Sequence, residues 1–478
     1  MADTKKRLLL IYPNQRWQKD DVNTVWDLNP ATLCLLAAVV KDIVDIKIID
    51  AQFYDMSKED FQAQVQEYNP DFFGVSVMTS EYQDTLDIAI DIAKKINPAI
   101  ITIAGGIHVT TKYSYAMKNN NLDYGIRGEG EYALRELLLY LTNQASFPSR
   151  GIIYRKGKEV IAQDQVFIED LTKLPWPNYS FVKFEDYANR GARVSPNRPT
   201  AYPTYRILTT RGCPFGCSFC QVELIAGKKV RARDPEDVVN ELLYMKERYG
   251  IKSIMFEDDN LLMAQAGNYA KKLFRLMIEK ELNLEWVGIA FALFLFTDEI
   301  LDLMQKSGCK GVNVSIESGT KRVLKEIVKK PIKDLKLIPE IIQKVHDRGI
   351  YCIASFIIGF PGETWEEIRQ TIFFAEHCGA DYVKIFVAVP LYGTELYNIA
   401  LATNSLTHDD EFPKTDWRHS QIKSDEWSAK DISILRAYEW DRINFAPHKI
   451  DKVAEIWGVD KEQLKEIRKK TRDSLKFV

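Results

Sequence analysis

The chain has 478 residues, which at roughly 150 residues per domain corresponds to about three domains. Hydrophobic residues make up 46% of it and charged residues 27%, a balance typical of folded globular proteins that excludes a disordered chain. The formal net charge of −3 argues against a nucleic-acid partner bound through bulk positive charge, so no such partner is expected.

Neither a membrane span nor a secretion signal is expected. The longest uncharged apolar stretch, Trp286–Thr297, is shorter than the roughly 20 residues that cross a bilayer. The first residues lead from charge directly into a strand-like run, without the cleavage site of a signal peptide. Seven cysteines are too few and too scattered for a secreted disulfide scaffold, so we expect a cytoplasmic, reducing location.

Residues 1–145 alternate short β-branched runs with amphipathic segments, which predicts a doubly wound, Rossmann-like α/β domain. The expected strands are Arg7–Tyr12, Asp45–Asp50, Phe72–Met78, Ile100–Ala104 and Tyr124–Arg127, and the expected helices are Ala31–Asp42, Lys58–Tyr68 and Tyr82–Ile96. Ligands of such sheets bind at the carboxyl ends of the strands. Turns of small residues at three of these ends therefore mark a candidate binding site.

The remainder divides into a linker, a second α/β domain and a helical tail. Residues 146–203 lose the periodicity and carry many prolines, so they are expected to form a linker with a small amount of structure. In residues 204–398 the alternation returns, with expected strands Tyr205–Thr210, Ser253–Glu257, Leu284–Ala292, Gly311–Ile316, Tyr351–Ile358 and Tyr382–Val389. Six such units are fewer than the eight of a closed barrel, which indicates a partial (β/α)6 barrel. Residues 399–478 are polar and tryptophan-rich, and a small, mostly helical region is expected there.

Three cysteines lie in a C-x3-C-x2-C pattern just after the first expected strand of this barrel: Cys213, Cys217 and Cys220. A structural zinc site needs a fourth ligand, and the next cysteine and histidine, Cys309 and His346, lie far along the chain. Three thiolates in one loop can instead bind three irons of a four-iron cluster, leaving the fourth iron open to a small ligand. Zinc and incidental thiols remain the alternatives. The other cysteines are expected to be buried small hydrophobes: Cys34, Cys309, Cys352 and Cys378.

This spacing, with the aromatic Phe219 before the last cysteine, resembles the signature of the radical S-adenosylmethionine (SAM) superfamily. The resemblance implies a [4Fe-4S] cluster bound by the three cysteines. It continues along the barrel in elements that contact SAM in that family, and the matching residues are Asp258, Asp259, Ser315, Glu317, Gly359 and Gly362. Each element alone is a weak signal, so the weight rests on their order and spacing.

The resemblance also implies a chemistry. The open iron is expected to chelate the amino and carboxylate groups of SAM. One electron from an external donor such as flavodoxin or ferredoxin then cleaves SAM and releases a 5′-deoxyadenosyl radical, which can abstract hydrogen from an unactivated carbon. The protein positions the reactants and excludes water and oxygen, so anaerobic activity is expected. No side chain is singled out as catalytic.

A doubly wound domain before such a barrel resembles the cobalamin-binding subfamily, which includes the class B radical SAM methyltransferases. The turns with Thr79 and Ser80 and with Gly105, Gly106 and His108 resemble its cobalamin contacts, and glycine allows close backbone approach. The D-x-H-x-x-G motif that supplies a histidine to cobalt in other cobalamin enzymes is absent. For His108, a hydrogen bond to backbone is accordingly a simpler interpretation than cobalt ligation.

These observations leave three functional hypotheses. The favoured one is cobalamin-dependent methylation of an unactivated carbon, with S-adenosylhomocysteine and 5′-deoxyadenosine as co-products. Its substrate would be a small molecule, or a lipid-like one if the apolar segment Gly288–Phe296 forms a wall rather than packing against a helix. The second is a non-methylating radical SAM enzyme, such as a dehydratase, cyclase or epimerase, with the first domain as a scaffold. The third is a non-enzymatic cobalamin sensor.

Overall fold

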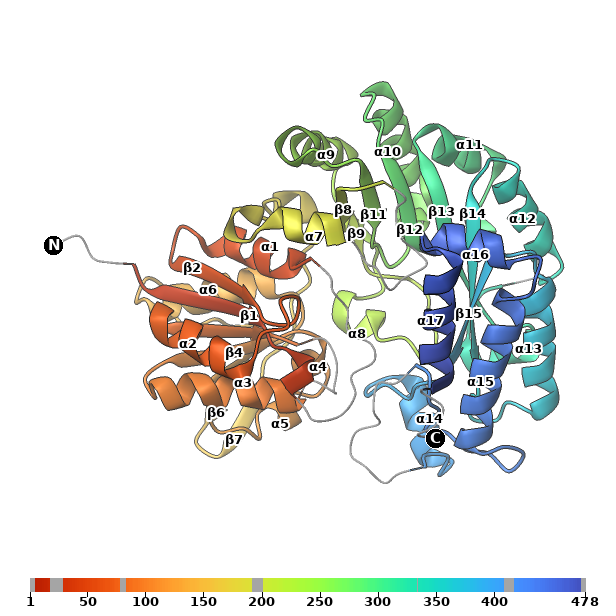
Figure 1. The fold of residues 1–478 in the computed structure, drawn as a ribbon. Helices are drawn as coiled ribbons and strands as arrows, with labels where there is room; N and C mark the ends of the chain where they lie inside the picture. The colour runs from red at the N-terminus through yellow and green to blue at the C-terminus, as the bar shows by residue number, and fades with distance from the viewer. Residues whose placement is uncertain are drawn as a thin grey trace. The chain divides into compact units, whose positions relative to one another are not determined.

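The computed structural model describes residues 5–17, 29–77, 83–190, 201–332, 334–407 and 417–473. They divide into two compact units, the first formed by Met1–Arg190 with Leu224–Ala226 and the second by Gly191–Glu223 with Gly227–Val478 (Figure 1). Among the described helices, none has both the length and the apolarity that a bilayer span requires.

The first unit is built on a seven-stranded sheet with the order β2-β1-β3-β4-β5-β6-β7. Its strands are β1 (Arg7–Tyr12), β2 (Asp45–Asp50), β3 (Phe72–Ser76), β4 (Ile101–Gly105), β5 (Tyr124–Ile126), β6 (Ile152–Lys156) and β7 (Glu159–Ala162). The first five are parallel to one another, which confirms the predicted doubly wound domain. Chain order reverses between β1 and β3, and such a reversal is where open α/β sheets bind ligands.

Helices cover both faces of this sheet, as the view in Figure 1 shows. One face carries α1 (Ala31–Val40) and α6 (Gly130–Leu141), and the other carries α2 (Lys58–Tyr68) and α3 (Gln83–Ile96) with the short α4 (Ile107–Thr111) and α5 (Tyr113–Ala116). Ser57 begins α2, because its hydroxyl accepts the N–H of Asp60 at 3.0 Å. The core between the layers is apolar and includes the fully buried Phe61 and Phe73.

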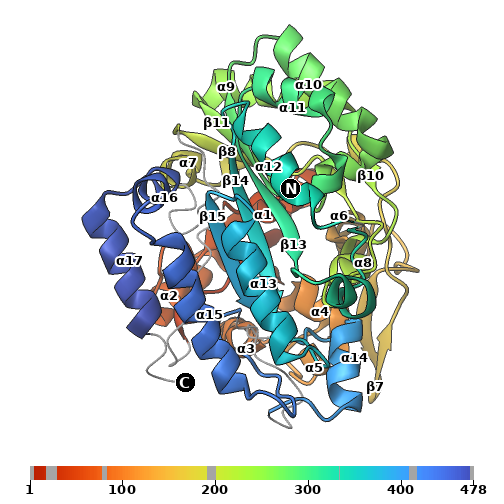
Figure 2. The same ribbon diagram turned by 90° about the vertical axis from the view of Figure 1, so that its right-hand side faces the viewer.

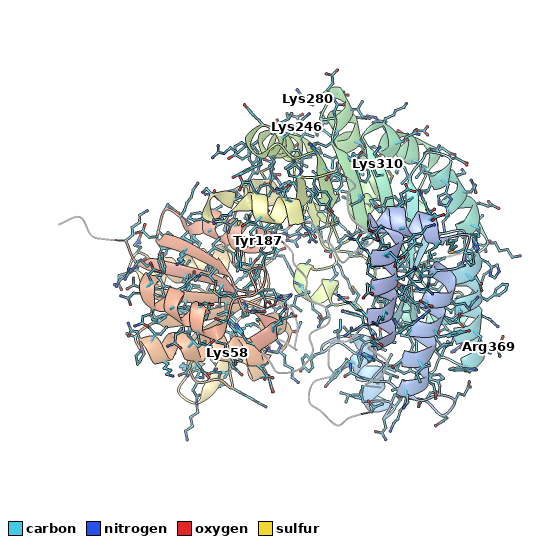
Figure 3. All side chains as sticks on the ribbon, in the orientation of Figure 1. Lys58, Tyr187, Lys246, Lys280, Lys310 and Arg369 are labelled. Atoms are coloured by element: carbon cyan, nitrogen blue, oxygen red, sulfur yellow. The ribbon has the colours of Figure 1, made fainter. Side chains whose placement is uncertain are left out.

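The structure in residues 146–203 includes a hairpin that the sequence did not predict. Strands β6 and β7 form a hairpin that extends the sheet antiparallel to β5. The signal was present in the two residues between them, Gly157 and Lys158, because glycine at a φ of 63° suits a tight hairpin turn. The strands are short and half-exposed, so their alternation is weak. After the hairpin, α7 (Phe184–Arg190) places the hydroxyl of Tyr187 3.2 Å from Asp50 Oδ2 (Figure 3).

The second unit contains six parallel strands in the order β8-β11-β12-β13-β14-β15, which confirms the partial barrel. The strands are β8 (Thr204–Ile207), β11 (Ser253–Phe256), β12 (Glu285–Phe291), β13 (Cys309–Glu317), β14 (Tyr351–Ile358) and β15 (Tyr382–Val387). The helices along the outer side are α9 (Pro235–Tyr249), α10 (Asn268–Glu279), α11 (Asp298–Lys306), α12 (Leu337–His346) and α13 (Trp365–His377) (Figures 1 and 2).

Alternate residues of each strand face these helices. Trp286 stacks on Phe274 of α10 with ring centroids 5.0 Å apart, and Phe356 contacts Phe374 of α13 at 6.3 Å. Because successive side chains of a strand point to opposite faces, the residues between them face the barrel interior. Ser355, next to Phe356, is one of these inward residues.

The C-terminal region is helical, as predicted, and covers the open edge of the barrel sheet. Its longest helix is α15 (Ala429–Asn444), which lies against β15 (Figure 2). Asn444 accepts the N–H of Val383 and donates to the C=O of Val383, both at 2.8 Å, and Arg436 Nε donates to the C=O of Ile385 at 2.9 Å. These side chains satisfy backbone groups that an edge strand would otherwise leave unpaired.

We expect Asn444→Leu to lower the free energy of unfolding of the second unit by about 3 kcal/mol, because two buried backbone groups of Val383 lose their partners. Urea titration followed by tryptophan fluorescence measures the change. Lys430→Gln, at an exposed position of the same helix, is the matched control and should stay within about 0.5 kcal/mol of the parent. An Asn444→Leu protein as stable as this control would show that the edge contact contributes nothing.

Candidate functional site

The cysteine loop follows the first barrel strand and is anchored by backbone hydrogen bonds. A short antiparallel ladder joins the chain before and after it, β9 (Thr210–Arg211) pairing with β10 (Arg231–Ala232). The N–H of Cys213 donates to the C=O of Gly227 at 3.2 Å, and the N–H of Ser218 donates to the C=O of Val328 at 3.0 Å. The loop is therefore fixed at both ends to the second unit.

The three thiols of the loop are free and half-buried, whereas the other four cysteines are buried, as predicted. Burial raises the pKa of Cys217 to about 11 and that of Cys220 to about 12, so both bind protons that a metal would displace. In the described part of the chain, no three His, Cys, Asp or Glu side chains are close enough together to bind one metal ion. Three thiols in one loop fit a four-iron cluster, in which each thiolate would bind a different iron.

Asp258 lies just after β11 and holds the residues that lead into the cysteine loop. Its Oδ1 accepts four hydrogen bonds, from the N–H and hydroxyl groups of Thr209 (3.1 and 2.8 Å) and of Thr210 (2.5 and 2.6 Å). Its Oδ2 is buried and has no partner among the described residues. Burial raises the pKa of Asp258 to about 6, so the side chain is mostly ionised at pH 7 and keeps one free acceptor atom.

The neighbouring Asp259 connects the same acidic segment to the loop itself. Its Oδ2 accepts the N–H of Gly212, the residue before Cys213, at 3.2 Å. Burial raises the pKa of Asp259, and the hydrogen bond from Gly212 opposes that rise. The structure thus places both predicted aspartates next to the cysteine loop.

The glycine-rich turn after β14 also lies beside the loop. Phe360, in this turn, has its ring centroid 6.2 Å from that of Phe219. Gly359 and Gly362 have φ values of 82° and 76°, a region that favours glycine. A Cβ on Gly359 would also lie 2.9 Å from Ile432, so this position has a packing reason to be glycine.

The G-x-x-G-E motif of this turn ends in Glu363, whose carboxyl group bonds to the backbone of the turn. Its Oε2 accepts the N–H groups of Gly359 (2.8 Å) and Phe360 (3.0 Å). Its Oε1 is buried without a partner among the described residues. Burial raises the pKa of Glu363 to about 8, so at pH 7 the free oxygen carries a proton and offers a hydrogen-bond donor.

Ser315 and Glu317 both lie on β13, but they differ in burial and in their partners. Ser315 is half-buried and pairs in register with Ser355 of β14. Glu317 is buried, and its Oε1 accepts from Lys330 Nζ at 2.7 Å. Burial lowers the pKa of Lys330, but the Glu317 carboxylate and the thiols of Cys217 and Cys220 together raise it more, so its pKa lies above the usual range. No local sequence pattern signals Lys330, because this partner is brought close only by the chain's turn after β13.

Several buried polar atoms near the cysteine loop therefore lack partners among the described residues, among them the acceptors Asp258 Oδ2 and Asn260 Oδ1 and the protonated Glu363 Oε1. A buried polar atom without a hydrogen bond costs free energy, so such atoms indicate a missing ligand. The ammonium group and ribose hydroxyls of SAM can donate to the two acceptors, and its adenine ring nitrogens can accept from Glu363. The residues present thus fit SAM beside an iron–sulfur cluster.

In the first unit, the predicted glycine turn at the end of β4 packs against neighbouring parts of the chain. A Cβ on Gly106, whose φ is 102°, would lie 2.1 Å from the C=O oxygen of Val77, so close approach to the end of β3 requires glycine. At Gly105 a Cβ would make only an ordinary contact, 3.6 Å from Ile126. Thr79 and Ser80 lie outside the described residues.

His108 lies in the first turn of the short helix α4, and it is buried. Its Nε2 is 2.5 Å from Oε1 of Gln83. Burial lowers the pKa of His108 to about 4, so the ring stays neutral at pH 7. Nε2, one of the two nitrogens that could bind cobalt, is therefore already engaged.

The apolar segment after β12 mainly packs inside the unit. Phe291, Leu293 and Phe296 are buried, in agreement with the packing interpretation, whereas Phe294 is 43% exposed. The Phe294 ring lies 5.7 Å from that of Phe215 in the cysteine loop. These residues therefore do not form a continuous exposed apolar surface. Phe294 alone among them is an exposed aromatic side chain beside the cysteine loop.

Comparisons with known proteins agree with the division of the chain into two units. The radical SAM superfamily model matches residues 207–375, and the B12 binding domain model matches residues 22–138. The chain is 32% identical to an uncharacterized methyltransferase of Pyrococcus horikoshii, over 84% of each chain. It is 29% identical to the cytidylyl-2-hydroxyethylphosphonate methyltransferase of Streptomyces wedmorensis, over 81% of this chain and 78% of that protein. The structure of the radical SAM methyltransferase TsrM from Kitasatospora setae, with cobalamin and a [4Fe-4S] cluster bound, shares the fold (TM-score 0.69, 19% identity, 93% of this chain and 86% of that one).

We expect Lys330→Met to lower the free energy of unfolding of the second unit by about 3 kcal/mol, because it leaves the Glu317 carboxylate buried without its counter-ion. The double variant Glu317→Leu/Lys330→Met removes both charges and should regain most of the loss. Urea titration of the two variants measures the difference. Equal losses in both would show that the two residues do not stabilise each other as an ion pair.

Proposed function

The chain belongs to the radical SAM superfamily and carries a B12-binding domain, and from this we propose that it is a cobalamin-dependent methyltransferase acting on an unactivated carbon of a small-molecule substrate. The observation that carries the proposal is the cysteine loop, fixed by Asp258 beside buried acceptor atoms that fit SAM. Two of its relatives are named as methyltransferases, which favours methyl transfer over elimination or cyclisation.

The residues of the second unit have distinct roles in this proposal. Cys213, Cys217 and Cys220 bind three irons of a [4Fe-4S] cluster. The ionised Asp258 accepts from the SAM ammonium through its free Oδ2, and the protonated Glu363 offers a donor at Oε1 that suits adenine. When bound, the cluster and SAM supply the radical that removes a hydrogen atom from the substrate, and cobalamin supplies the methyl group.

Further second-unit residues shape the surroundings of the cluster. Asp259 holds the loop through Gly212, Ser315 of β13 contributes a hydroxyl group from the inner face of the barrel, and Glu317 lies at the end of the same strand. The rings of Phe215 and Phe219 lie in the cysteine loop against other aromatic rings and exclude water from the cluster. Reaction in the absence of oxygen and an external one-electron donor, flavodoxin or ferredoxin, belong to the proposal, as does a cytoplasmic location.

The first unit is the cobalamin-binding domain of the proposal. Its binding edge is the carboxyl end of β3 and β4, where the turns with Gly105 and Gly106 are placed. Gly106 lets the chain pass close to Val77, which keeps the edge free of side-chain bulk. Because His108 is bound to Gln83, the domain would hold cobalamin without a histidine ligand from this turn.

Co-product analysis tests the proposal. Reconstituted anaerobically with iron, sulfide and cobalamin and given dithionite and SAM, the parent should form both 5′-deoxyadenosine and S-adenosylhomocysteine, measured by liquid chromatography and mass spectrometry. Cys213→Ala should reduce 5′-deoxyadenosine to the level found without enzyme, because the cluster loses a ligand. Cys309→Ala, at a buried cysteine of β13, is the matched control and should retain both products.

Each part of the result has a separate meaning. S-adenosylhomocysteine should disappear when cobalamin is omitted, since its formation requires transfer of the SAM methyl group to cobalt. If 5′-deoxyadenosine forms but S-adenosylhomocysteine never does, the chain is a radical SAM enzyme that does not methylate. If Cys213→Ala retains 5′-deoxyadenosine, the assignment of the cluster ligands is wrong.

A further inference from the structure

Lys384 lies on the inner face of the barrel sheet, and none of the proposed cofactor contacts involves it. Lys384 is on β15, in register with Ser355 of β14, and Ser355 is in register with Ser315 of β13. Residues in register on neighbouring strands point to the same face. Since Phe356 faces the outer helix α13, Ser355 and therefore Lys384 face inward.

The neighbours of Lys384 on this face are polar but uncharged. Ser355 Oγ donates to Asn313 Oδ1 at 3.0 Å, and Asn313 Nδ2 donates to the C=O of Ile289 at 2.9 Å. These two side chains thus satisfy each other and the backbone. Neither can neutralise an ammonium group.

Two other charged side chains of the barrel strands are paired among the described residues. Arg206 of β8 forms an ion pair with Glu257, and Glu317 forms one with Lys330. Lys384 has no ion pair or hydrogen bond with any residue that the structure describes. Burial lowers its pKa to about 8, and no nearby carboxylate opposes that effect.

The environment of Lys384 differs from that of the exposed lysines at the outside of the unit. Lys280 and Lys310 are exposed, and their side chains point away from the ribbon in Figure 3. Water solvates such ammonium groups at little cost. An inward ammonium without a counter-ion is costly, and a bound anion would remove that cost.

We propose that Lys384 binds an oxyanion of the substrate, a carboxylate, phosphate or phosphonate group, and so positions the carbon that reacts. The inference rests on the proposed function, because it takes the barrel interior as the place of reaction. β15 is the edge strand of the sheet opposite to β8, the strand that leads into the cysteine loop. The carboxylate of SAM is expected at the iron, so SAM would be contacted by residues of β11, β13 and β14. Lys384 of β15 would then be available to bind an anionic group of the substrate.

Chemical labelling of the reconstituted chain tests this assignment without turnover. At pH 8 a lysine with a pKa of about 8 is half neutral and reacts with an acetylating reagent, and peptide mass spectrometry reports the extent at each lysine. The probes are inorganic phosphate and acetate, with chloride at equal ionic strength as the reference. We expect phosphate or acetate at about ten times its Kd to slow the acetylation of Lys384 roughly tenfold, while exposed Lys280 reacts at an unchanged rate.

Two results would overturn the proposal. If neither anion protects Lys384 more than chloride does, the side chain binds no oxyanion. If SAM alone protects it fully, the anion is the methionine carboxylate of the cofactor and the substrate assignment is wrong. Both readouts are independent of the co-product assay, so failure here is distinguishable from failure of the methyltransferase proposal.

A stability measurement on variants provides the second test. Phosphate should raise the melting temperature of the parent and of Lys384→Arg, which keeps the positive charge, by more than it raises that of Lys384→Met. An equal shift in all three proteins would place the phosphate elsewhere and contradict the proposal. Lys310→Met, at an exposed lysine of β13, is the matched control and should respond as the parent does.

Discussion

The carboxylate of Asp258 is the contact on which the second unit depends. It lies at the end of one barrel strand and accepts four hydrogen bonds from Thr209 and Thr210, which lead from another strand into the cysteine loop. Because the four donors converge on one oxygen, the loop begins at a fixed position relative to the sheet. The other oxygen stays free, which is costly in the protein alone and favourable when a ligand donates to it.

Buried charge in this unit has two different uses. Glu317 with Lys330 and Arg233 with Glu241 are paired inside the protein, so their charges are balanced without a ligand. The partly buried Lys384 and the buried carboxylate of Asp258 have no such partner among the described residues. Structural ion pairs therefore differ from charged groups whose partner would be a ligand. An unpaired charge inside a protein lowers its stability, so it is retained where function requires it.

Much of this could be predicted from local sequence. The bounds of β2 and β14 match the predicted ranges Asp45–Asp50 and Tyr351–Ile358, because β-branched runs between turn residues identify buried strands well. The β6–β7 hairpin was missed because its strands are short and half-exposed. Partners such as Lys330 for Glu317 and Gln83 for His108 depend on tertiary packing, and no local pattern encodes them. The cysteine spacing identified the loop, but only the structure shows which atoms around it lack partners.

Cobalamin binding by the first unit, in a chain whose second unit binds the cluster, is tested most directly by cobalamin retention. The chain would be reconstituted anaerobically with iron and sulfide, mixed with hydroxocobalamin, desalted and scanned in the ultraviolet and visible. The account predicts a stoichiometric corrinoid spectrum together with the iron–sulfur absorbance. An intact cluster with no retained corrinoid would contradict it and would make the first unit a scaffold.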